Sequence, residues 1–352
     1  MKILYAIQAT GNGHISRANT LIPQLSKLGT VDTFLSGSNS SLKPQFPVNY
    51  KSNGLSLFYD HTGGLDYQKI LKKNRFFKCI SEALQLPIED YDLIINDFEP
   101  ITSLACKLKK KYSIQVSHQA SFLSKYTPRP KSKERIGESI LNYYSTSNDK
   151  IGFHFKRYDD FILGPIIKDQ ILNADPRDFG HITVYLPGFG ESTLQTTLHS
   201  LAANTFECFV PNRKSIEIIK NIKLLPTDNS LFTQSMIQSH GLIIGAGFET
   251  PSEALFLEKK ILSIPLKAHY EQLCNAAALE NMGQPVIYPN KVKNLTSIIS
   301  DWLRLEKTPA PITPTSSSVL ANKILEKFEN HRASELSFST FSELDYPSEV
   351  TF

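Results

Sequence analysis

The segment from Gly241 to Gly283 constrains the fold of this chain most strongly. A short apolar run opens it, a Gly-Ala-Gly turn at 245–247 breaks the run, and a helix follows near Pro251. A second apolar strand, a polar loop and another helix complete the segment. Short apolar strands that alternate with helices indicate a parallel sheet, which is buried on both faces. Ligands of such sheets bind at the carboxyl ends of the strands, which is where the glycine turn lies.

The glycine turn predicts an anion-binding site. Glycines let the backbone turn sharply and let a ligand approach closely. Pro251 suits the first helical turn, and we expect Thr250 or Ser252 to cap the helix. The free N–H groups at the start of a helix favour an anion.

Three spaced elements of this segment carry a family resemblance. The runs G-A-G-F-E-T-P-S-E-A-L, I-P-L and E-Q-L-C-N-A resemble the donor-binding segment of GT-B glycosyltransferases. The similarity is greatest to the branch of the peptidoglycan N-acetylglucosaminyltransferase that forms lipid II, with its uncharacterised bacterial and archaeal relatives. The resemblance implies an α/β fold with two Rossmann-like, doubly wound parallel-sheet domains that face a cleft. It covers most of residues 1–305, and its specific part is the donor segment.

The resemblance also implies roles for individual residues. Glu253 matches the glutamate that holds the nucleotide ribose, and a carboxylate can accept hydrogen bonds from two hydroxyls. Glu271 and Gln272 match residues that face the donor sugar. Plant-type members carry a diphosphate-binding histidine where this chain has Gly245, so here the diphosphate is left to backbone N–H groups. The expected donor-binding residues are Gly188, Gly245, Ala246, Gly247, Phe248, Glu253, Glu271, Gln272 and Asn275.

A second glycine turn follows the first apolar strand. Gly11 and Gly13 match part of a dinucleotide fingerprint, but the third glycine and a well-placed acidic residue are missing. The run G-N-G-H-I-S-R instead resembles the acceptor-side loop of GT-B enzymes. His14 in this loop can take a proton from an acceptor hydroxyl near neutral pH. The alternative interpretation is a histidine that only bonds the loop backbone.

Two carboxylates follow the predicted strand at 93–95. Asp97 and Glu99 lie beyond its carboxyl end, on the side of His14 if the sheet is parallel. An aspartate in this position orients the loop histidine in several glycosyltransferases, so Asp97 is the first candidate and Glu99 the second. An equal alternative is that a carboxylate caps the helix near Ile101.

The end of the next strand adds His118 and Gln119 to the same cleft. With the first glycine turn they form the acceptor side, and a third histidine, His61, is a weaker candidate in its own loop. The expected acceptor-side residues are Gly11, Asn12, Gly13, Glu99, His118 and Gln119.

Length and charge narrow the possible partners. A chain of 352 residues is long enough for two domains. A net charge of +4 permits an anionic donor or a membrane surface and gives no reason to expect nucleic acid. The segment from Phe122 to Arg135 mixes basic and aromatic residues, which fits either a rim on anionic lipid or a solvated loop. The charge run from Lys107 to Lys111 suits the dipole at a helix end.

Cysteine usage and hydropathy suggest the compartment. The four cysteines are scattered and predict neither a disulfide frame nor a zinc site. No apolar run is long enough to span a bilayer. We therefore expect a cytoplasmic protein, at most peripheral at the inner face of the membrane.

The expected division places an acceptor-side domain at 1–163, a nucleotide-sugar donor domain at 164–331 and a polar tail at 332–352. The resemblance implies that the last helix, from about Ser318 to His331, crosses back onto the first domain.

The leading hypothesis is an inverting, metal-independent transfer from a nucleotide sugar, UDP-linked by resemblance, to a sugar or lipid-linked acceptor. By the same resemblance, we expect this reaction to belong to cell-envelope polysaccharide or glycolipid synthesis. His14 is the expected base, Asp97 its partner, and no cofactor is expected because no D-x-D motif marks a metal site. The alternative enzyme is a GT-B-fold epimerase of UDP-N-acetylglucosamine, which needs several carboxylates, such as Asp97, Glu99 and Glu271. A sugar-nucleotide-binding protein without catalysis is a third class.

Overall fold

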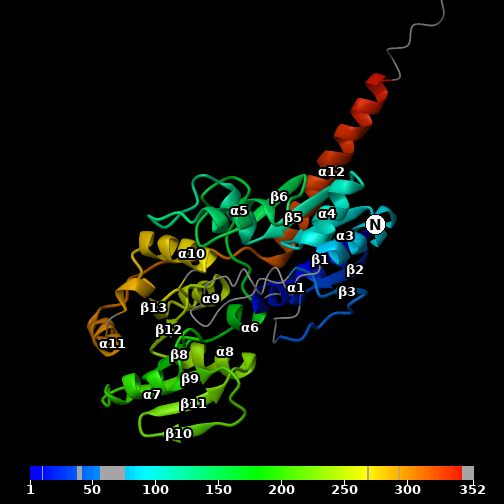
Figure 1. Ribbon diagram of the computed structural model, residues 1–352. Helices are drawn as coiled ribbons and strands as arrows, with labels where there is room; N and C mark the ends of the chain where they lie inside the picture. Colours follow the sequence, from blue (N-terminus) through cyan, green and yellow to red (C-terminus); the bar gives the residue numbers. More distant parts are fainter. Residues whose placement is uncertain (10, 38–41, 56–75, 268, 293, 343–352) are drawn as a thin grey trace, which may run out of the picture.

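The computed structural model describes residues 1–352 except 10, 38–41, 56–75, 268, 293 and 343–352. Two α/β domains lie side by side (Figure 1), and each is built on its own sheet. This is the fold class expected from the sequence. His61 lies outside the described residues.

The first sheet has the strand order β3-β2-β1-β4-β5-β6-β7, and all of its neighbouring strands pair in parallel. Apolar residues such as Ile3 and Ile95 fill its central strands because helices cover both faces of a parallel sheet. The strands are β1 (Lys2–Gln8), β2 (Thr30–Ser36), β3 (Tyr50–Ser52), β4 (Leu93–Asp97), β5 (Ser113–Ser117), β6 (Asp149–Phe153) and β7 (Ile162–Leu163).

Helices and short 3₁₀ turns connect these strands. The chain order reverses between β1 and β4, since β1 pairs with β2 on one side and with β4 on the other. The connecting elements are α1 (Asn12–Leu25), α3 (Phe76–Gln85), η1 (Ile88–Asp90), α4 (Pro100–Leu108), η2 (Gln119–Leu123) and α5 (Arg135–Tyr143).

The second sheet has the order β10-β11-β9-β8-β12-β13 and is parallel except for the edge pair of β10 and β11. Its chain order reverses between β8 and β12. The strands are β8 (His181–Tyr185), β9 (Thr205–Val210), β10 (Glu217–Ile219), β11 (Ile222–Pro226), β12 (Gly241–Ile244) and β13 (Lys260–Ser263). The connecting elements are α6 (Asp169–Leu172), α7 (Glu191–His199), α8 (Asn229–Gln238), α9 (Glu249–Phe256), α10 (Tyr270–Asn281), η3 (Pro289–Lys291) and α11 (Leu295–Arg304).

The last helix, α12 (Ser317–Ser342), returns to the first domain. Figure 1 shows it beside the first sheet, where it packs against α1. Leu320 and Ile324 are buried in this contact region. The helix ends at Ser342 and not near His331, where the sequence suggested its end. The last buried apolar side chain among those described in this helix is Phe328, and good helix formers such as Ala333, Glu335 and Leu336 continue the helix beyond it.

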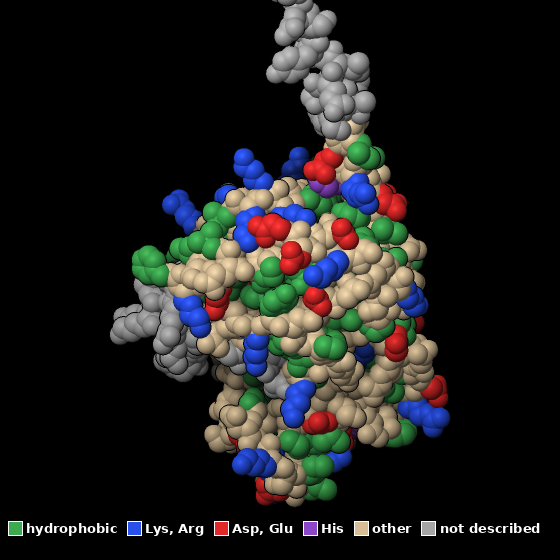
Figure 2. All heavy atoms as spheres, turned by 90° about the vertical axis from the view of Figure 1, so that its right-hand side faces the viewer, with side chains coloured by type: hydrophobic (Ala, Val, Ile, Leu, Met, Phe, Trp, Pro, Cys, Tyr) green, Lys and Arg blue, Asp and Glu red, His purple; other side chains and the backbone are tan. Residues whose placement is uncertain are grey.

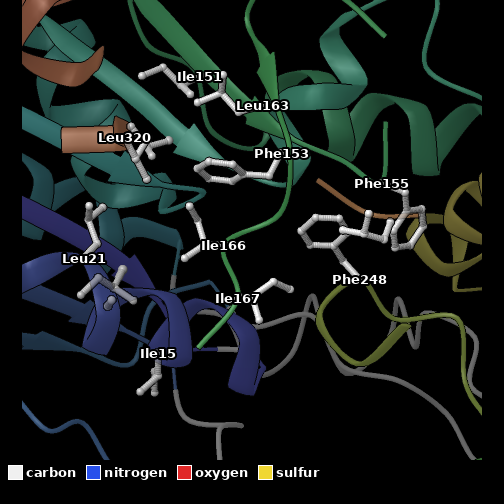
Figure 3. Close-up of a cluster of buried hydrophobic side chains, with 14 of the residues drawn as sticks. Ile15, Leu21, Ile151, Phe153, Phe155, Leu163, Ile166, Ile167, Phe248 and Leu320 are labelled. Atoms are coloured by element: carbon white, nitrogen blue, oxygen red, sulfur yellow. The ribbon is translucent and has the colours of Figure 1, made fainter. Parts of the chain in front are cut away.

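One hydrophobic core crosses the seam between the two domains. Figure 3 shows Phe248 of the second domain close to Phe155, while Phe153, Ile166 and Ile167 continue the core toward α1. Because close-packed interiors hold their shape, this shared core fixes how the two sheet edges face each other.

The face in Figure 2 mixes lysine and arginine side chains with acidic ones and carries no single-sign field. In the part of the chain that the structure describes, no helix has the length and apolar character needed to cross a membrane.

Candidate active site

The two points where strand order reverses face each other across the domain seam. Open α/β sheets bind their ligands in the crevice outside such a point. In the first domain this point lies between β1 and β4, and in the second between β8 and β12. The expected site residues come from the turns at these strand ends.

His14 and Asp97 form a direct hydrogen bond. The β1–β4 register puts Asp97 opposite Ile7, next to the turn that bears His14. His14 Nδ1 lies 2.8 Å from Asp97 Oδ1, and the Asp97 side chain is fully buried. Because an ionised carboxylate only accepts hydrogen bonds, His14 Nδ1–H donates to Asp97, which leaves the lone pair on Nε2 available to act as a base.

His14 lies in a helix, whereas the sequence suggested a loop. α1 starts at Asn12, with Gly11 as its N-cap. His14 therefore belongs to the first helical turn. Asn12 and Gly13 line a cavity of about 530 Å³ at the cleft.

Arg17 completes the cluster and was not among the site residues expected from the sequence. Its Nε and Nη2 atoms each lie 3.0 Å from an oxygen of Asp97, which is a bidentate contact. Burial acts to raise the pKa of Asp97, but the charges of Arg17 and His14 outweigh it and hold this pKa below its ordinary value. The signal was present, since Arg17 follows His14 by one helical turn.

Glu249 brings the second domain into this cluster. Its Oε1 atom lies 2.8 Å from Arg17 Nη1, although the two residues are 232 positions apart. A Cβ atom on Gly13 would lie 2.9 Å from Glu249 Cγ, so the glycine makes room for this side chain. Enclosure raises the pKa of Glu249 to about 7, against the opposing effect of Arg17. Glu249 was not among the expected site residues either.

In the turn at 245–248, Gly245 and Gly247 lie at a cavity, whereas Phe248 lies at the seam between the domains. Gly245 and Gly247 line a cavity of about 310 Å³, together with Gly188 and Gln272. Gln272 Oε1 accepts a hydrogen bond of 2.9 Å from the backbone N–H of Leu266, which fixes its orientation. The turns after β8, β12 and β13 build most of this wall.

Glu253 lines the larger cavity of about 530 Å³, where Lys168 lies next to it. Lys168 Nζ is 3.2 Å from Glu253 Oε2 and 2.8 Å from Thr233 Oγ1. Burial raises the pKa of Glu253, and Lys168 opposes this shift. Tyr185 and Thr250 line both cavities, so the two cavities adjoin.

The expected cap of α9 is wrong. The helix starts at Glu249, and Phe248 is its N-cap without a side-chain capping bond. Ser252 Oγ instead donates to the Phe248 carbonyl at 2.8 Å, as serines inside helices do. The first N–H groups of α9 have no side-chain cap, and Thr250 in this first turn lines both cavities.

His118 and Gln119 bind the second domain. His118 stacks on Phe248 with ring centroids 3.9 Å apart, and its Nε2 atom lies 2.9 Å from Asn275 Oδ1. Gln119 Nε2 donates to Glu271 Oε2 at 3.1 Å. Burial lowers the pKa of His118. These residues, expected on the acceptor or the donor, tie the two domains together.

Two further candidates are buried in structural positions. The Ala246 carbonyl accepts from Asn275 Nδ2 at 3.2 Å. The Glu99 carboxylate accepts from the N–H groups of Ile101 at 2.9 Å and Thr102 at 2.6 Å. Glu99 thus caps α4, which is the alternative that the sequence left open, and its full burial keeps it from an acceptor.

Among the described residues, no three His, Cys, Asp or Glu side chains gather in a way that would hold a metal ion.

Three solved glycosyltransferases have a fold similar to that of this chain. UGT89C1 of Arabidopsis thaliana, solved with UDP, has a TM-score of 0.57 at 13% identity, covering 92% of this chain and 94% of its own. MurG of Acinetobacter baumannii has a TM-score of 0.55 at 12% identity, with 92% and 99% covered. CalG4, the calicheamicin glycosyltransferase, has a TM-score of 0.54 at 11% identity, and the match covers 98% of this chain and 99% of CalG4. Because the TM-scores of UGT89C1 and MurG are similar, the comparison does not favour the MurG branch over the plant one.

A search of curated proteins found no match to this sequence. The family model described as glycosyl transferase family 1 matches residues 1–301, which is most of the chain. With the two facing parallel-sheet domains, this match shows that the chain belongs to glycosyl transferase family 1 and is a glycosyltransferase of the GT-B fold.

Proposed function

We propose that this enzyme transfers a sugar from a UDP-linked donor to an acceptor hydroxyl, with inversion and without a metal ion. The observation that carries the proposal is the His14–Asp97 pair at 2.8 Å, since His14 follows directly on Asn12 and Gly13, which line the larger cavity between the two domains. A base held by a carboxylate is what deprotonation of a hydroxyl needs.

The donor spans both cavities in this proposal. The nucleoside occupies the larger cavity, where Glu253 accepts hydrogen bonds from the ribose hydroxyls. The diphosphate lies at Gly247 and Thr250, near the uncapped first turn of α9. The sugar enters the smaller cavity beside Gln272. UGT89C1 was solved with UDP and with UDP-L-rhamnose, which supports UDP as the nucleotide.

The reaction is a single displacement. His14 Nε2 takes the proton of the acceptor hydroxyl, and Asp97 stabilises the resulting imidazolium. The acceptor oxygen bonds to the anomeric carbon as the bond from that carbon to the diphosphate oxygen breaks. The nucleoside diphosphate leaves, and the N–H groups at the α9 turn stabilise its charge. Attack opposite the leaving group inverts the anomeric centre.

In the proposed ribose site, the Glu253 carboxylate would be shared between Lys168 and the ribose hydroxyls of the donor. In the free enzyme Lys168 holds Glu253 at 3.2 Å. Lys168 also donates to Thr233 Oγ1 at 2.8 Å. This second hydrogen bond holds Lys168 in place when the ribose hydroxyls bind to the Glu253 carboxylate. This preset orientation of Glu253 reduces the cost of ordering it on binding.

The epimerase alternative lacks a supporting observation. It needs several carboxylates near one sugar. The Glu99 carboxylate accepts hydrogen bonds from the first N–H groups of α4, and Glu271 is bound to Gln119 at the seam.

The acceptor is a sugar or lipid-linked hydroxyl in this proposal, reached at the inner face of a membrane. The supporting feature is the rim after η2, in which Tyr126 is 63% exposed and residues 131–135 are exposed. Part of the expected rim is packed instead, because Phe122 is buried and Arg129 is bound to Glu138 at 2.6 Å. Cosedimentation with anionic and neutral vesicles tests the contact: binding to neither speaks against it.

Thermal shift against UDP, GDP, dTDP and their sugars tests the donor site. A ligand at about 100 times its Kd adds roughly 2.7 kcal/mol of stability. We expect a shift with UDP and UDP-sugars that Glu253→Ala weakens. A shift with none of the nucleotides would contradict the donor assignment. A product assay for a new glycosidic bond against a sugar epimer then separates transfer from epimerisation.

A further inference from the structure

A polar cavity of about 400 Å³ lies at the edge of the first sheet that faces away from the cleft. It is formed by the last turns of α4, the start of β5 and the loop before β6. The site residues of the cleft follow the carboxyl ends of the strands, whereas Ser113 begins β5 and Ser147 precedes β6. The cavity is therefore separate from the donor and acceptor sites.

Lysine is the only kind of charged side chain among the described residues that line this cavity. Lys107, Lys110 and Lys111 all take part in its wall. The carboxylates nearby are engaged elsewhere, since Glu89 binds Lys109 at 3.0 Å and Asp149 binds Lys327 at 2.8 Å.

The helix dipole alone does not explain this charge. α4 ends at Leu108, and its carboxyl end carries about half a negative charge. One lysine is enough to balance it. The last turn is also bonded by its own backbone, because the N–H groups of Lys109 and Lys111 donate to Ala105 and Cys106 at 2.9 Å. A surplus of positive charge remains at the cavity.

Two hydroxyl groups in the wall have unused hydrogen-bonding capacity. Ser113 is 1% exposed, and its Oγ atom has no hydrogen-bond partner among the described residues beyond the weak thiol of Cys106 beside it. The enclosed Oγ atom of Ser147 has none either. Buried hydroxyls without partners are unfavourable, and an anion with several oxygens would accept from both.

We propose that this cavity binds a phosphate group. The lysines supply charge, and the hydroxyls of Ser113 and Ser147 donate to the phosphate oxygens. The volume of about 400 Å³ exceeds that of a phosphate ion, so the group belongs to a larger molecule, either a soluble phosphomonoester or a phospholipid with an exposed phosphate. The site does not depend on the proposed donor chemistry.

Thermal shift of the full chain with inorganic phosphate and glycerol 3-phosphate tests the site, with chloride adjusted to constant ionic strength. Saturating UDP is added in a parallel series so that phosphate binding in the cleft is competed away. We expect both phosphates to raise the Tm of the wild type in both series. The double variant Lys107→Gln/Lys110→Gln should lose most of this shift. The matched control Lys109→Gln, from the same turn but outside the cavity wall, should keep it.

Ser113→Ala separates binding from folding. Without ligand, its Tm should equal or exceed that of the wild type because an unpartnered hydroxyl is removed. Its affinity for phosphate should fall by roughly 2–10-fold, the scale of one lost hydrogen bond. Equal affinity would overturn the proposed contact. No shift in the wild type beyond that of chloride, or an equal shift in the double lysine variant, would overturn the site.

Vesicles of phosphatidylcholine with and without phosphatidic acid distinguish the two sources. Lysine-dependent cosedimentation with phosphatidic acid identifies a lipid phosphate. Binding of glycerol 3-phosphate without cosedimentation identifies a soluble phosphomonoester.

Discussion

The two walls of the cleft are built from different chemistry. On the first domain, His14, Asp97 and Arg17 form a compact charged cluster with contacts of 2.8–3.0 Å. On the second domain, the smaller cavity is lined by turns and apolar side chains, and Lys267 is its single charged side chain among the described residues. A proton-transfer group needs a fixed charge partner, whereas a diphosphate can be held by backbone N–H groups. Substitutions in the first wall should therefore impair turnover, and those in the second should impair donor affinity.

The two walls meet at one ion pair. Arg17 holds Asp97 on its own domain and Glu249 on the other. The cluster around the proposed base is thus complete only when the domains are apposed as they are in this structure. Because the proposed base and the proposed donor site lie on separate domains, their effects can be tested separately.

The largest effect is expected for His14→Ala. Loss of a general base lowers turnover by about 10²–10⁴-fold. Initial rates should be measured with an acceptor on which the wild type is active. Asp97→Asn should also slow turnover, because Asn cannot stabilise the imidazolium. Wild-type turnover of His14→Ala would remove it from the base role.

Arg17→Met should destabilise the protein by about 3–5 kcal/mol. The substitution leaves the Asp97 carboxylate fully buried without its cation. Urea unfolding measures the free energy. The matched control is Lys27→Met, since the exposed Lys27 side chain lies just beyond the end of α1 and donates to Gln24 there. If both variants unfold at the same urea concentration, the buried ion pair is not what stabilises this wall.

Glu253→Ala should weaken UDP binding by roughly 1.5–3 kcal/mol, the scale of charge-assisted hydrogen bonds. Calorimetry measures the affinity. Glu280→Ala, at an exposed position of α10, is the control and should bind UDP as the wild type does. Unchanged affinity of Glu253→Ala would rule out the ribose contact.

Gly13→Ala should cost about 1–3 kcal/mol, because the new Cβ atom would meet Glu249 Cγ at 2.9 Å. Gly11→Ala should cost less, since no atom lies within 4 Å of its added Cβ. The two variants lie in one turn and differ in the contact with the second domain. If both variants lose the same thermal stability, the close contact between Gly13 and Glu249 does not contribute to the cost of Gly13→Ala.

Glu249→Gln should change how stability depends on pH. The folded pKa of about 7 lies above the ordinary carboxyl value, so the folded protein binds the proton more tightly between about pH 4.5 and 7. The wild type should therefore lose stability as pH rises through 7, on the order of 1 kcal/mol after screening, and the variant should lack this part. The test is the unfolding free energy of the wild type and of Glu249→Gln at pH 5 and at pH 8. If both proteins change by the same amount between the two pH values, the proposed titration of Glu249 is contradicted.

The sequence predicted the groups that depend on local pattern. Apolar strands followed by glycine turns predicted both parallel sheets, and strand ends of a parallel sheet converge. That is why His14 and Asp97 were predicted to meet, and the structure confirms that they do. The two-domain fold and the family also followed from the donor segment.

Long-range contacts and buried turns were harder to predict. Glu249 meets Arg17 from 232 positions away, and no local pattern encodes that distance. Phe248 and Asn275 occur in the donor segment, yet they pack on His118 at the seam. The same residue types serve a ligand or an interface, and only tertiary packing decides between the two.

The most direct test of the account is the donor-binding isotherm of His14→Ala. If the first wall performs the chemistry and the second holds the donor, a UDP-sugar should bind this variant within about twofold of the wild-type Kd while turnover is lost. Loss of donor binding together with turnover would contradict the account, because it would show that His14 holds the donor and that the two walls do not have separate tasks.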